Sequence, residues 1–318
     1  MSRYISIRRI AAAVMVAAIQ ACNAAAPMQK IQAPGFYRMI LGQFEITALS
    51  DGGSPLPVSQ MLRGVDPGRL TASLRDAFLD DPVETSVNAF LINTGSKLVL
   101  IDTGAGTLLG PRQGKLLANL RASGYLPEQV DEIDITHMHG DHVGGLSANG
   151  KPVFPNAVVR ASRQDAEFWL DERRMRAAPE SMRVHFEAAM NAIGPYARLG
   201  RFKPFDGETV LQPGITARPA PGHTPGHTVY VVESGGSKLL VIGDLIHLGA
   251  VQLANPAITV QYDVDPRMAA RTRESVLAEA AHERYWVAAA HLPFPGMGHL
   301  RASGTGYVLV PVNYSSLP

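Results

Sequence analysis

Three histidines and an aspartate fall within six consecutive residues of this chain, directly after a short apolar run. The cluster is His137-Met138-His139-Gly140-Asp141-His142, and it holds three of the ten histidines in the sequence. Neutral imidazoles and carboxylates are the ligands that suit zinc and its first-row neighbours. The cluster offers more donors than one tetrahedral ion with an open position can use. We therefore expect a centre for two metal ions, completed by ligands from elsewhere in the chain.

Residues 1–26 have the pattern of a secretory signal peptide: a basic start, an apolar Ala-rich stretch and small residues before a cleavage point. The basic start contains Arg8-Arg9 and no acidic residue, and the apolar stretch covers residues 10–19. That stretch is too short to cross a bilayer as a permanent anchor. An amphipathic helix kept in the mature protein is the alternative. We expect an exported protein, periplasmic or secreted, without a stable membrane span.

Cys22 is the only cysteine, and it lies at the edge of the segment to be removed. It forms a weak lipoprotein-type site, because Gln20 is out of character there. Without Cys22 the mature protein can form no internal disulfide. Its metal centre must then be built from histidine and carboxylate side chains, which excludes thiolate ligation.

The composition favours one globular domain over residues 27–318. The chain has 46% hydrophobic and 18% charged residues, which is typical of a folded protein with a substantial core. Its formal net charge is +1, and Lys and Arg form no block with interleaved aromatic residues. A nucleic-acid partner is therefore not expected, because such partners require a basic surface.

Short strand-like runs occur in both halves of the chain, with helical patterns between them. Helices are expected over residues 70–79, 111–122, 164–176, 180–193 and 266–282. Two short strands joined near Gly42 are expected within residues 35–50. Further strands are expected over residues 87–92, 97–102, 133–136, 158–160, 210–211, 215–218, 228–233, 238–242, 258–262, 285–290 and 307–312. Residues 98–101 are all apolar, which indicates a strand buried on both faces. This order predicts an α/β protein with two sheets packed together and covered by helices.

Further metal-ligand candidates follow other expected strands. His223 and His227 lie in a loop rich in Pro and Gly, Asp244 follows an apolar strand, and His291 follows another. Loops at the ends of strands on a rigid scaffold are the usual position of catalytic groups. Each residue has a structural alternative: His227 competes with His223 as ligand, Asp244 could cap a turn, and His291 could be a core histidine.

Taken together, these four clusters resemble the metallo-β-lactamase superfamily over residues 87–299, with His-x-His-x-Asp-His followed by His, Asp and His in order. The resemblance implies an αββα sandwich of two mixed sheets with two divalent metal ions at one edge. Zinc is expected, and manganese, iron or cobalt would suit the same ligands. Carried over by position, one metal would be held by His137, His139 and His223, and the other by Asp141, His142 and His291. Asp244 would bridge them, and His227 would hydrogen-bond behind the ligands.

The same resemblance implies a hydrolase in which a hydroxide shared by the metals attacks the substrate, with Asp244 and Asp141 as catalytic carboxylates. Residues 88–95, 101–104, 142–146 and 291–299 resemble most closely the methyl parathion hydrolase group. Members of that group are exported enzymes that hydrolyse organophosphate triesters, and their relatives open lactones and cleave aryl esters. The resemblance also implies a homodimer acting on a small-molecule substrate.

Aromatic side chains line the substrate cleft in that group. By position Trp169 and Phe186 would be two of them, although core packing explains both residues equally well. Leu109 stands where a third aromatic residue is expected. A smaller aliphatic wall favours lactones and aryl esters over triesters. The remaining histidines, His185, His247, His282 and His299, are expected to be structural or at the surface.

Other functions stay open at this point. An acyl-homoserine lactonase, a β-lactamase and a glyoxalase-II-like thioesterase share the expected fold, and export fits the first two better than the third. A non-catalytic metal-binding protein is a different class of function, against which the complete ligand set argues. A di-iron redox enzyme would need a flavin-bearing partner domain, for which no residues remain.

Overall fold

The computed structural model describes residues 26–317, of which residues 34–317 belong to one compact unit. The expected signal peptide, with Cys22, lies outside the described residues except for Ala26. Across residues 26–317, none of the helices has the length and apolar character needed to cross a bilayer.

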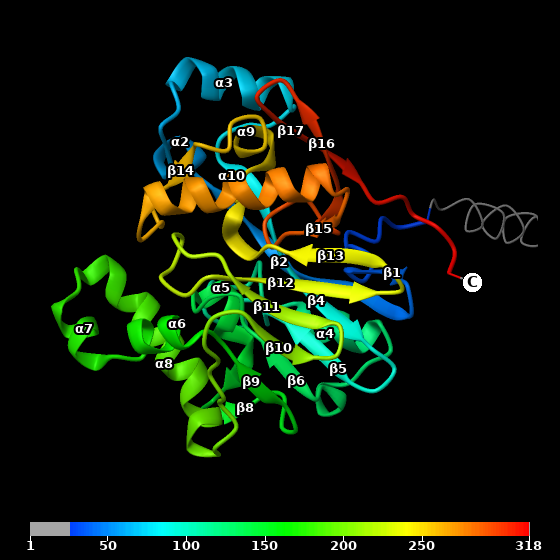
Figure 1. The fold of residues 1–318 in the computed structure, drawn as a ribbon, viewed down its shortest axis with the longest axis vertical. Coiled ribbons are helices and arrows are strands. Elements are labelled where there is room, and N and C mark those ends of the chain that lie inside the picture. Colours follow the sequence, from blue (N-terminus) through cyan, green and yellow to red (C-terminus); the bar gives the residue numbers. More distant parts are fainter. Residues whose placement is uncertain (1–25, 318) are drawn as a thin grey trace, which may run out of the picture. The chain divides into compact units, whose positions relative to one another are not determined.

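Two large sheets form the centre of the fold (Figure 1). The first has six strands in the order β1 (Phe36–Leu41), β2 (Phe44–Leu56), β4 (Val83–Asn93), β5 (Leu98–Ile101), β6 (Glu132–Asp134) and β9 (Val158–Arg160). The second has seven in the order β10 (Thr209–Gln212), β11 (Ile215–Pro219), β12 (Thr228–Ser234), β13 (Ser237–Val241), β15 (Trp286–Ala288), β16 (Met297–Ser303) and β17 (Gly306–Pro311). Each contains antiparallel and parallel pairs, so the prediction of two mixed sheets is confirmed.

Strand β5 is buried on both faces, between the second sheet and the helices that cover the first sheet. Its four residues are all buried, and successive side chains point to opposite faces. Val99 and Ile101 join the core between the sheets, where they meet residues such as Tyr230 of β12. Leu98 and Leu100 join a second core under the helices. The continuous apolar run in the sequence therefore correctly predicted a strand buried on both faces.

Helices cover the outer faces of both sheets. The first sheet is covered by α4 (Leu116–Ala122), α6 (Arg163–Trp169) and α8 (Glu180–Arg198). The second is covered by α10 (Pro266–His282), whose N-terminus is capped by the side chain of Asp265. In Figure 1 the green helices α6, α8 and α7 (Glu172–Ala177) form one group, apart from the orange α10.

Short elements complete the chain. Two small sheets pair β3 (Leu62–Arg63) with β14 (Thr259–Val260) and β7 (Ser147–Ala148) with β8 (Lys151–Pro152). The remaining helices are α2 (Val58–Met61), α3 (Pro67–Asp76), α5 (Gly140–Val143) and α9 (Gly249–Gln252). Turns of 3-10 helix are η1 (Pro127–Gln129), η2 (Gly144–Leu146) and η3 (Gly243–Leu245).

Some expected boundaries were wrong. Strand β2 does not end near residue 50 but continues through Gly52 to Leu56, because a bulge after Ser50 keeps it paired with β4. The helix expected over residues 164–176 is split into α6 and α7, because Asp171 caps a new helix with hydrogen bonds to two backbone N–H groups. Strand β16 was not expected at all.

Candidate metal centre

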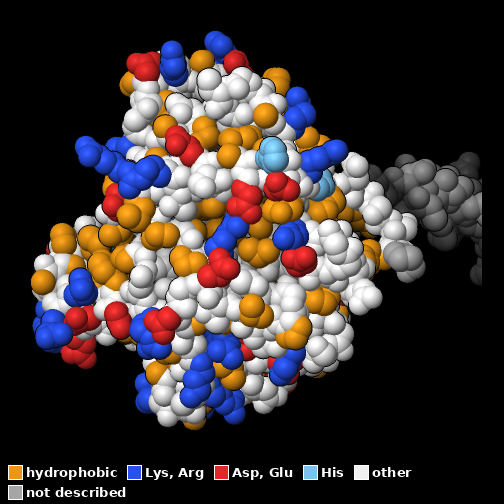
Figure 2. Space-filling model, viewed as in Figure 1, with side chains coloured by type: hydrophobic (Ala, Val, Ile, Leu, Met, Phe, Trp, Pro, Cys, Tyr) orange, Lys and Arg blue, Asp and Glu red, His pale blue; other side chains and the backbone are white. Residues whose placement is uncertain are grey.

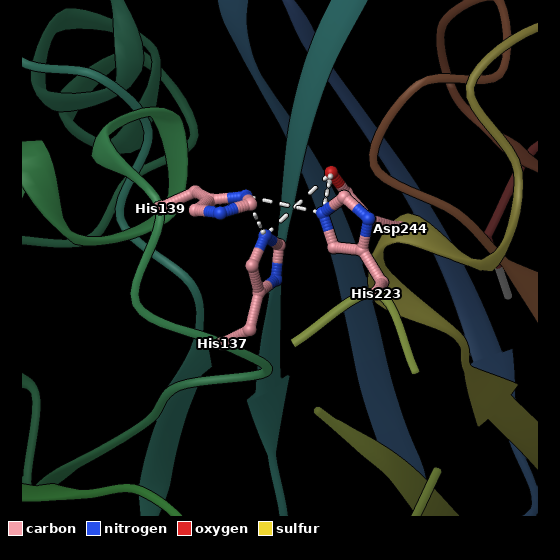
Figure 3. A group of neighbouring side chains, drawn as sticks. All are labelled: His137, His139, His223 and Asp244. Carbon is pink, nitrogen blue, oxygen red and sulfur yellow. Dashed lines mark hydrogen bonds and ion pairs between the residues drawn. The ribbon is translucent and has the colours of Figure 1, made fainter. Parts of the chain in front are cut away.

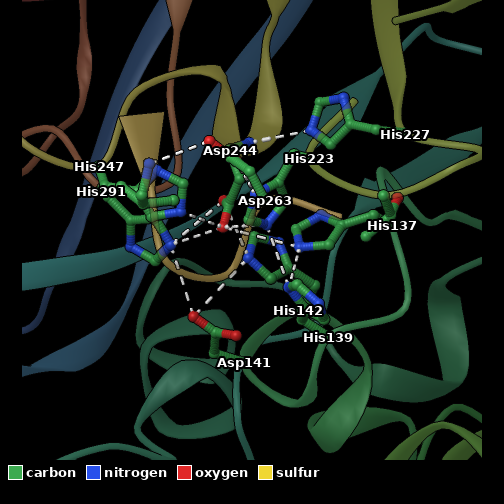
Figure 4. Close-up of polar contacts among 12 residues, drawn as sticks. His137, His139, Asp141, His142, His223, His227, Asp244, His247, Asp263 and His291 are labelled. Carbon is green, nitrogen blue, oxygen red and sulfur yellow. Dashed lines mark hydrogen bonds and ion pairs between the residues drawn. The ribbon is translucent and has the colours of Figure 1, made fainter. Parts of the chain in front are cut away.

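The ligand residues predicted from the sequence meet at one edge of the two sheets. The loop with His137 and His139 follows β6, and His223 lies between β11 and β12. Asp244 lies in η3 directly after β13, and His291 follows β15. Figure 4 shows these side chains pointing toward one another from both halves of the chain. Residues far apart in the sequence therefore form one cluster.

Four ligand atoms surround the first metal position (Figure 3). His139 Nδ1 lies 3.1 Å from both His137 Nε2 and His223 Nε2. Asp244 Oδ2 lies 3.6 Å from His137 Nε2 and 3.4 Å from His223 Nε2. Ligands of a tetrahedral zinc ion, each about 2.0–2.1 Å from the metal, are about 3.3 Å apart. The spacing of these buried atoms therefore fits one tetrahedral ion.

The second position lies on the other side of the same carboxylate. Asp244 Oδ1 is 3.1 Å from His142 Nε2 and 3.2 Å from His291 Nε2. Asp141 Oδ2 is 3.7 Å from His142 Nε2 and 3.5 Å from His291 Nε2. Asp141 is the one ligand whose side chain is partly exposed, at 23%. Asp244 thus lies between the two groups of ligands: Oδ2 is near His137 and His223, Oδ1 is near His142, and His291 Nε2 is 3.2 Å from each oxygen.

Unpaired polar atoms support two cations here. His142 Nε2 and Asp244 Oδ1 are buried and have no hydrogen-bond partner among the described residues, although they face each other at 3.1 Å. A buried unpaired donor or acceptor costs about 1–3 kcal/mol. A divalent cation between imidazole nitrogens and carboxylate oxygens would satisfy both atoms, and imidazole and carboxylate suit such ions. The residues present therefore fit two divalent metal ions.

Hydrogen bonds behind the site fix the ring orientation of three of the histidines, His223, His291 and His142. His223 Nδ1 donates to Asp263 Oδ1 at 2.8 Å, and His291 Nδ1 donates to the carbonyl oxygen of Ser86 at 2.9 Å. Such partners leave the other ring nitrogen free for the metal and strengthen it as a ligand. Asp263 Oδ2 is 4.0 Å from the guanidinium of Arg273, which is buried. Arg273 donates hydrogen bonds to the backbone carbonyls of Leu245, Pro256 and Ile258.

Asp102 fixes the ring orientation of His142 through a hydrogen bond to its Nδ1 atom. Its Oδ2 accepts from His142 Nδ1 at 2.8 Å, and its carboxylate also accepts from the backbone and hydroxyl of Thr136. Asp102 has a φ of 61°, in the left-handed region that Asp tolerates better than most residues. This backbone conformation turns the end of β5 so that the carboxylate faces the metal centre.

Asp165 on α6 joins two ligand loops. Its carboxylate accepts from the backbone N–H of Met138, the hydroxyl of Thr224 and the backbone N–H of Gly226 at 3.0, 3.0 and 2.6 Å. Burial raises its pKa to about 6, although these hydrogen bonds oppose the shift. Asp165 therefore fixes the distance between the His137–His139 segment and His223.

Burial and neighbouring charges set the ionisation of the histidines and of Asp244 at the candidate metal centre. Burial lowers the pKa of His137 and His139 well below the usual value, which keeps both rings neutral. Burial opposes the ionisation of Asp244, but the surrounding imidazoles of His142 and His291 hold its pKa well below its usual range. Two imidazoles of the first metal position are thus neutral, and its carboxylate is ionised. Burial opposes protonation of the third, but Asp244 and Asp263 raise the pKa of His223 to about 9, so a metal ion bound there displaces a proton from this ring.

A cleft of about 570 Å³ opens over the metal ligands. Its floor contains His139, Asp141, His223, Asp244 and His291. Figure 2 shows hydrophobic side chains gathered between α7 and the start of α10. The other lining residues are Ser54, Leu56, Met61, Thr85, Val87, Leu108, Leu109, Gln113, Gly140, Val184, His185, Glu187, Ala188, Asn191, His247 and Tyr262. A small organic molecule fits such a mostly apolar cleft with a few polar groups.

Of the three residues expected to line the cleft, only Leu109 does so. Leu109 lines it, with 51% of the residue exposed. Trp169 and Phe186, expected in its wall, are instead buried in the core, 1% and 2% exposed, and are absent from the lining. Phe186 points away because α8 turns Val184 and Ala188, four residues apart, toward the cleft. The ring of Trp169 packs edge-on against His139 from behind.

Two histidines that were expected to be structural lie in the cleft. His247 Nε2 lies 3.1 Å from Asp244 Oδ2, and its ring stacks on that of His291. Its position three residues after Asp244, within one turn, was the available signal. His185 lies with its ring centre 5.1 Å from that of His139. No local pattern marks His185, because its direction depends on how α8 packs.

Comparisons with known proteins agree with this geometry. Residues 82–291 match the family model described as the Metallo-beta-lactamase superfamily. The hydrolase AbOPH of the beta lactamase superfamily is 38% identical, with 90% of this chain and 100% of that chain covered and a TM-score of 0.86. AidC, a dizinc quorum-quenching lactonase, is 29% identical, with 89% and 99% covered and a TM-score of 0.82.

A match to a curated sequence is more distant. An N-acyl homoserine lactonase from Bacillus sp is 25% identical over 181 residues, which cover 50% of this chain and 64% of the relative. The chain spans 65% or less of the length of the curated relatives that it matches.

Proposed function

Because the chain belongs to the metallo-β-lactamase superfamily and brings seven metal-ligand residues together under a cleft, we propose that it is a binuclear hydrolase of lactones and aryl esters. Organophosphate triesters are poorer substrates in this proposal. The observation that carries it is the position of Asp244 between the two groups of ligands, with Oδ1 near His142 and Oδ2 near His223. Zinc is the proposed metal, since the related lactonase AidC is described as dizinc.

Two divalent cations, when bound, would supply a water of lowered pKa and would polarise the scissile carbonyl. The chain's own residues provide the geometry. Asp244 fixes the separation of the two ligand groups, and the partly exposed Asp141 places its carboxylate at the floor of the cleft. His247 presents its ring at the cleft beside Asp244, where it can contact the substrate.

The cleft wall supports lactones and esters over triesters. Leu108, Leu109 and Val184 are exposed aliphatic residues of the wall, and Tyr262 is the one Phe, Tyr or Trp residue that lines the cleft within residues 26–317. Aliphatic walls suit an acyl chain, whereas aromatic side chains favour aryl leaving groups. An acyl-homoserine lactonase is the narrower form of this function, which the named lactonases among the relatives support.

The other hydrolase functions have weaker support. β-Lactams and glutathione thioesters carry carboxylates, which a cationic side chain usually pairs with. The cleft lining within the described residues has no Lys or Arg, and it includes Glu187. Neutral substrates therefore fit the cleft better than anionic ones.

A hydrolysis panel tests the proposed function. Purified protein of measured metal content is assayed with γ-lactones, aryl esters, phosphotriesters and β-lactams. The expected order of kcat/KM places lactones and aryl esters above phosphotriesters, with β-lactams lowest. A clear preference for paraoxon-like triesters contradicts the proposed substrate class, and no turnover of any substrate contradicts the hydrolase itself.

Two further expectations are part of the proposal. Residues 1–26 support export to the periplasm or the medium, which N-terminal sequencing of the mature protein checks. A homodimer is proposed from the resemblance, and light scattering of the purified protein checks it.

A further inference from the structure

Gln113, a residue of the cleft lining, has a buried unpaired acceptor that the proposed chemistry does not use. Its side chain lines the cleft, and the residue is only 7% exposed. Its Nε2 donates to Ser54 Oγ at 2.7 Å, while Oε1 is buried without a hydrogen-bond partner among the described residues. Buried polar atoms in folded proteins are almost always paired, so an exception in a cleft indicates a position for a ligand donor.

The backbone around Gln113 is held rigidly. The buried carboxylate of Asp51 accepts hydrogen bonds from the backbone N–H groups of Ala105, Gly114 and Leu116, on both sides of Gln113. Gly52 also lies against this loop: a Cβ added at Gly52 would lie 2.2 Å from the carbonyl oxygen of Arg112. These contacts hold the loop backbone, and the hydrogen bond to Ser54 holds the side chain of Gln113, before a substrate binds, which lowers the entropy cost of binding.

The Gln113–Ser54 pair lies on the His291 side of the cleft. Ser54 of β2 is directly opposite Thr85 of β4, and both line the cleft. The next residue, Ser86, accepts the hydrogen bond that orients His291. The loop that carries Gln113 also carries the aliphatic residues Leu108 and Leu109. One segment thus offers an acceptor and an apolar wall beside the metal ligands.

We infer that Gln113 Oε1 accepts a hydrogen bond from the substrate and selects lactones or esters that carry an N–H or O–H donor on the acyl side of the scissile carbonyl. The inference rests on the proposed hydrolase function and narrows its substrate class. Simple aryl esters and phosphotriesters have no such donor, so they leave the oxygen unpaired. Sites that hydrogen-bond a substrate group discriminate strongly against analogues lacking it.

A matched pair of substrates tests the inference. One is a γ-butyrolactone with an acylamino group on the α-carbon, and the other has a methylene in place of the N–H and the same chain length. We expect kcat/KM of the metal-loaded wild type to be about 10- to 100-fold higher for the N–H lactone. In Gln113→Met, which has similar volume and no acceptor, this ratio falls to near one.

Two further variants separate the role of Gln113 from general effects. Gln113→Glu keeps an acceptor oxygen at the same place, and it keeps the preference for the N–H lactone. Gln43→Met changes an exposed glutamine outside the cleft lining, and it leaves the ratio unchanged. Metal content and melting temperature are measured for every variant.

The outcomes distinguish the inference from the proposed function. If the metal-loaded wild type opens neither lactone, the proposed hydrolase function fails. If it opens both with equal kcat/KM, or if Gln113→Met keeps the wild-type ratio, Gln113 does not select for the donor and the inference is overturned. If Gln113→Met does not fold, the wild-type ratio and Gln113→Glu decide the question.

Discussion

His227 Nε2 lies 3.1 Å from the backbone nitrogen of Asp244, so a buried imidazole accepts the hydrogen bond that positions the bridging residue. Burial lowers the pKa of His227 to about 3, with a further contribution from His223. The ring therefore stays neutral at ordinary pH and keeps its acceptor lone pair. Gly243 beside it has a φ of 50°, and a Cβ there would lie 2.7 Å from the same ring nitrogen.

Replacing His227 is expected to weaken the metal centre without removing a ligand. In His227→Ala the backbone of Asp244 loses its acceptor, and the bridging carboxylate loses its fixed position. Loss of such an outer partner typically lowers metal affinity or activity about 10- to 100-fold. Chelator competition followed by metal analysis measures the change. The exposed His282→Ala variant is the control, and equal affinity in both variants would show that His227 does not position Asp244.

Asp165→Asn is expected to lower both stability and metal affinity at the first position. An amide has one acceptor oxygen, and its NH₂ group would face the N–H donor of either Met138 or Gly226. The buried mismatch is expected to cost about 1–3 kcal/mol of unfolding free energy. Chemical denaturation and metal titration are the measurements, with the exposed Asp80→Asn as control. An unchanged metal affinity would refute the role of Asp165 in joining the two loops.

The stability of the folded protein is expected to depend on pH through Asp134 in β6. Both carboxylate oxygens are buried without a hydrogen-bond partner among the described residues, and burial, with Glu132 nearby, raises its pKa well above the usual 3.8. A raised folded-state pKa means that the folded protein binds more protons than the unfolded chain. The contribution of protonated Asp134 to the free energy of unfolding is fully present below pH 3.8, the usual pKa of an Asp. It is lost as the pH rises through the raised pKa that Asp134 has in the folded protein.

Asp134→Asn removes the cost of ionising this buried group. The variant is therefore expected to be more stable than the wild type at neutral pH, by about 1–3 kcal/mol, with the difference shrinking toward pH 4. Urea denaturation at several pH values measures it, and the exposed Asp80→Asn variant should show no comparable change. A wild type more stable than Asp134→Asn at pH 8 would mean that the native carboxylate is paired.

Leu109→Phe is expected to shift selectivity toward aryl phosphotriesters. Leu109 is exposed in the cleft wall, so a larger ring has space and gives the aryl group a flat surface to pack on. We expect the ratio of triester to lactone kcat/KM to rise about 10-fold, within the range typical of a single pocket contact. Leu199→Phe, at the exposed C-terminal end of α8, is the matched control. No change in the ratio would show that this wall does not limit triester turnover.

The sequence predicted the ligands better than the cleft for a physical reason. His137, His139, Asp141 and His142 lie in one short segment, Asp244 and His291 come shortly after apolar strands, and His223 lies in a Pro- and Gly-rich loop. Local patterns therefore marked all seven as candidates, and the structure brings them together. The cleft depends on which way helix faces point once they are packed, and a rotation of 100° per residue separates the buried Phe186 from the cleft residue His185.

The supporting residues could not be predicted for a related reason. Asp165 contacts residues 27 and 61 positions away, and Asp51 holds a loop more than 50 positions away. These contacts exist only after the two sheets and their helices have assembled. The bulge in β2 is similar: Gly52 indicates a turn locally, but pairing with β4 keeps the strand continuous.

The metal content of the purified protein tests the central claim most directly. After loading with zinc and removal of free metal, elemental analysis gives the number of ions per chain. The arrangement of Asp244 between two groups of ligands predicts two ions per chain in the wild type, and fewer than two in Asp244→Ala. A single ion per wild-type chain, or an unchanged content in Asp244→Ala, would contradict a binuclear centre bridged by this residue.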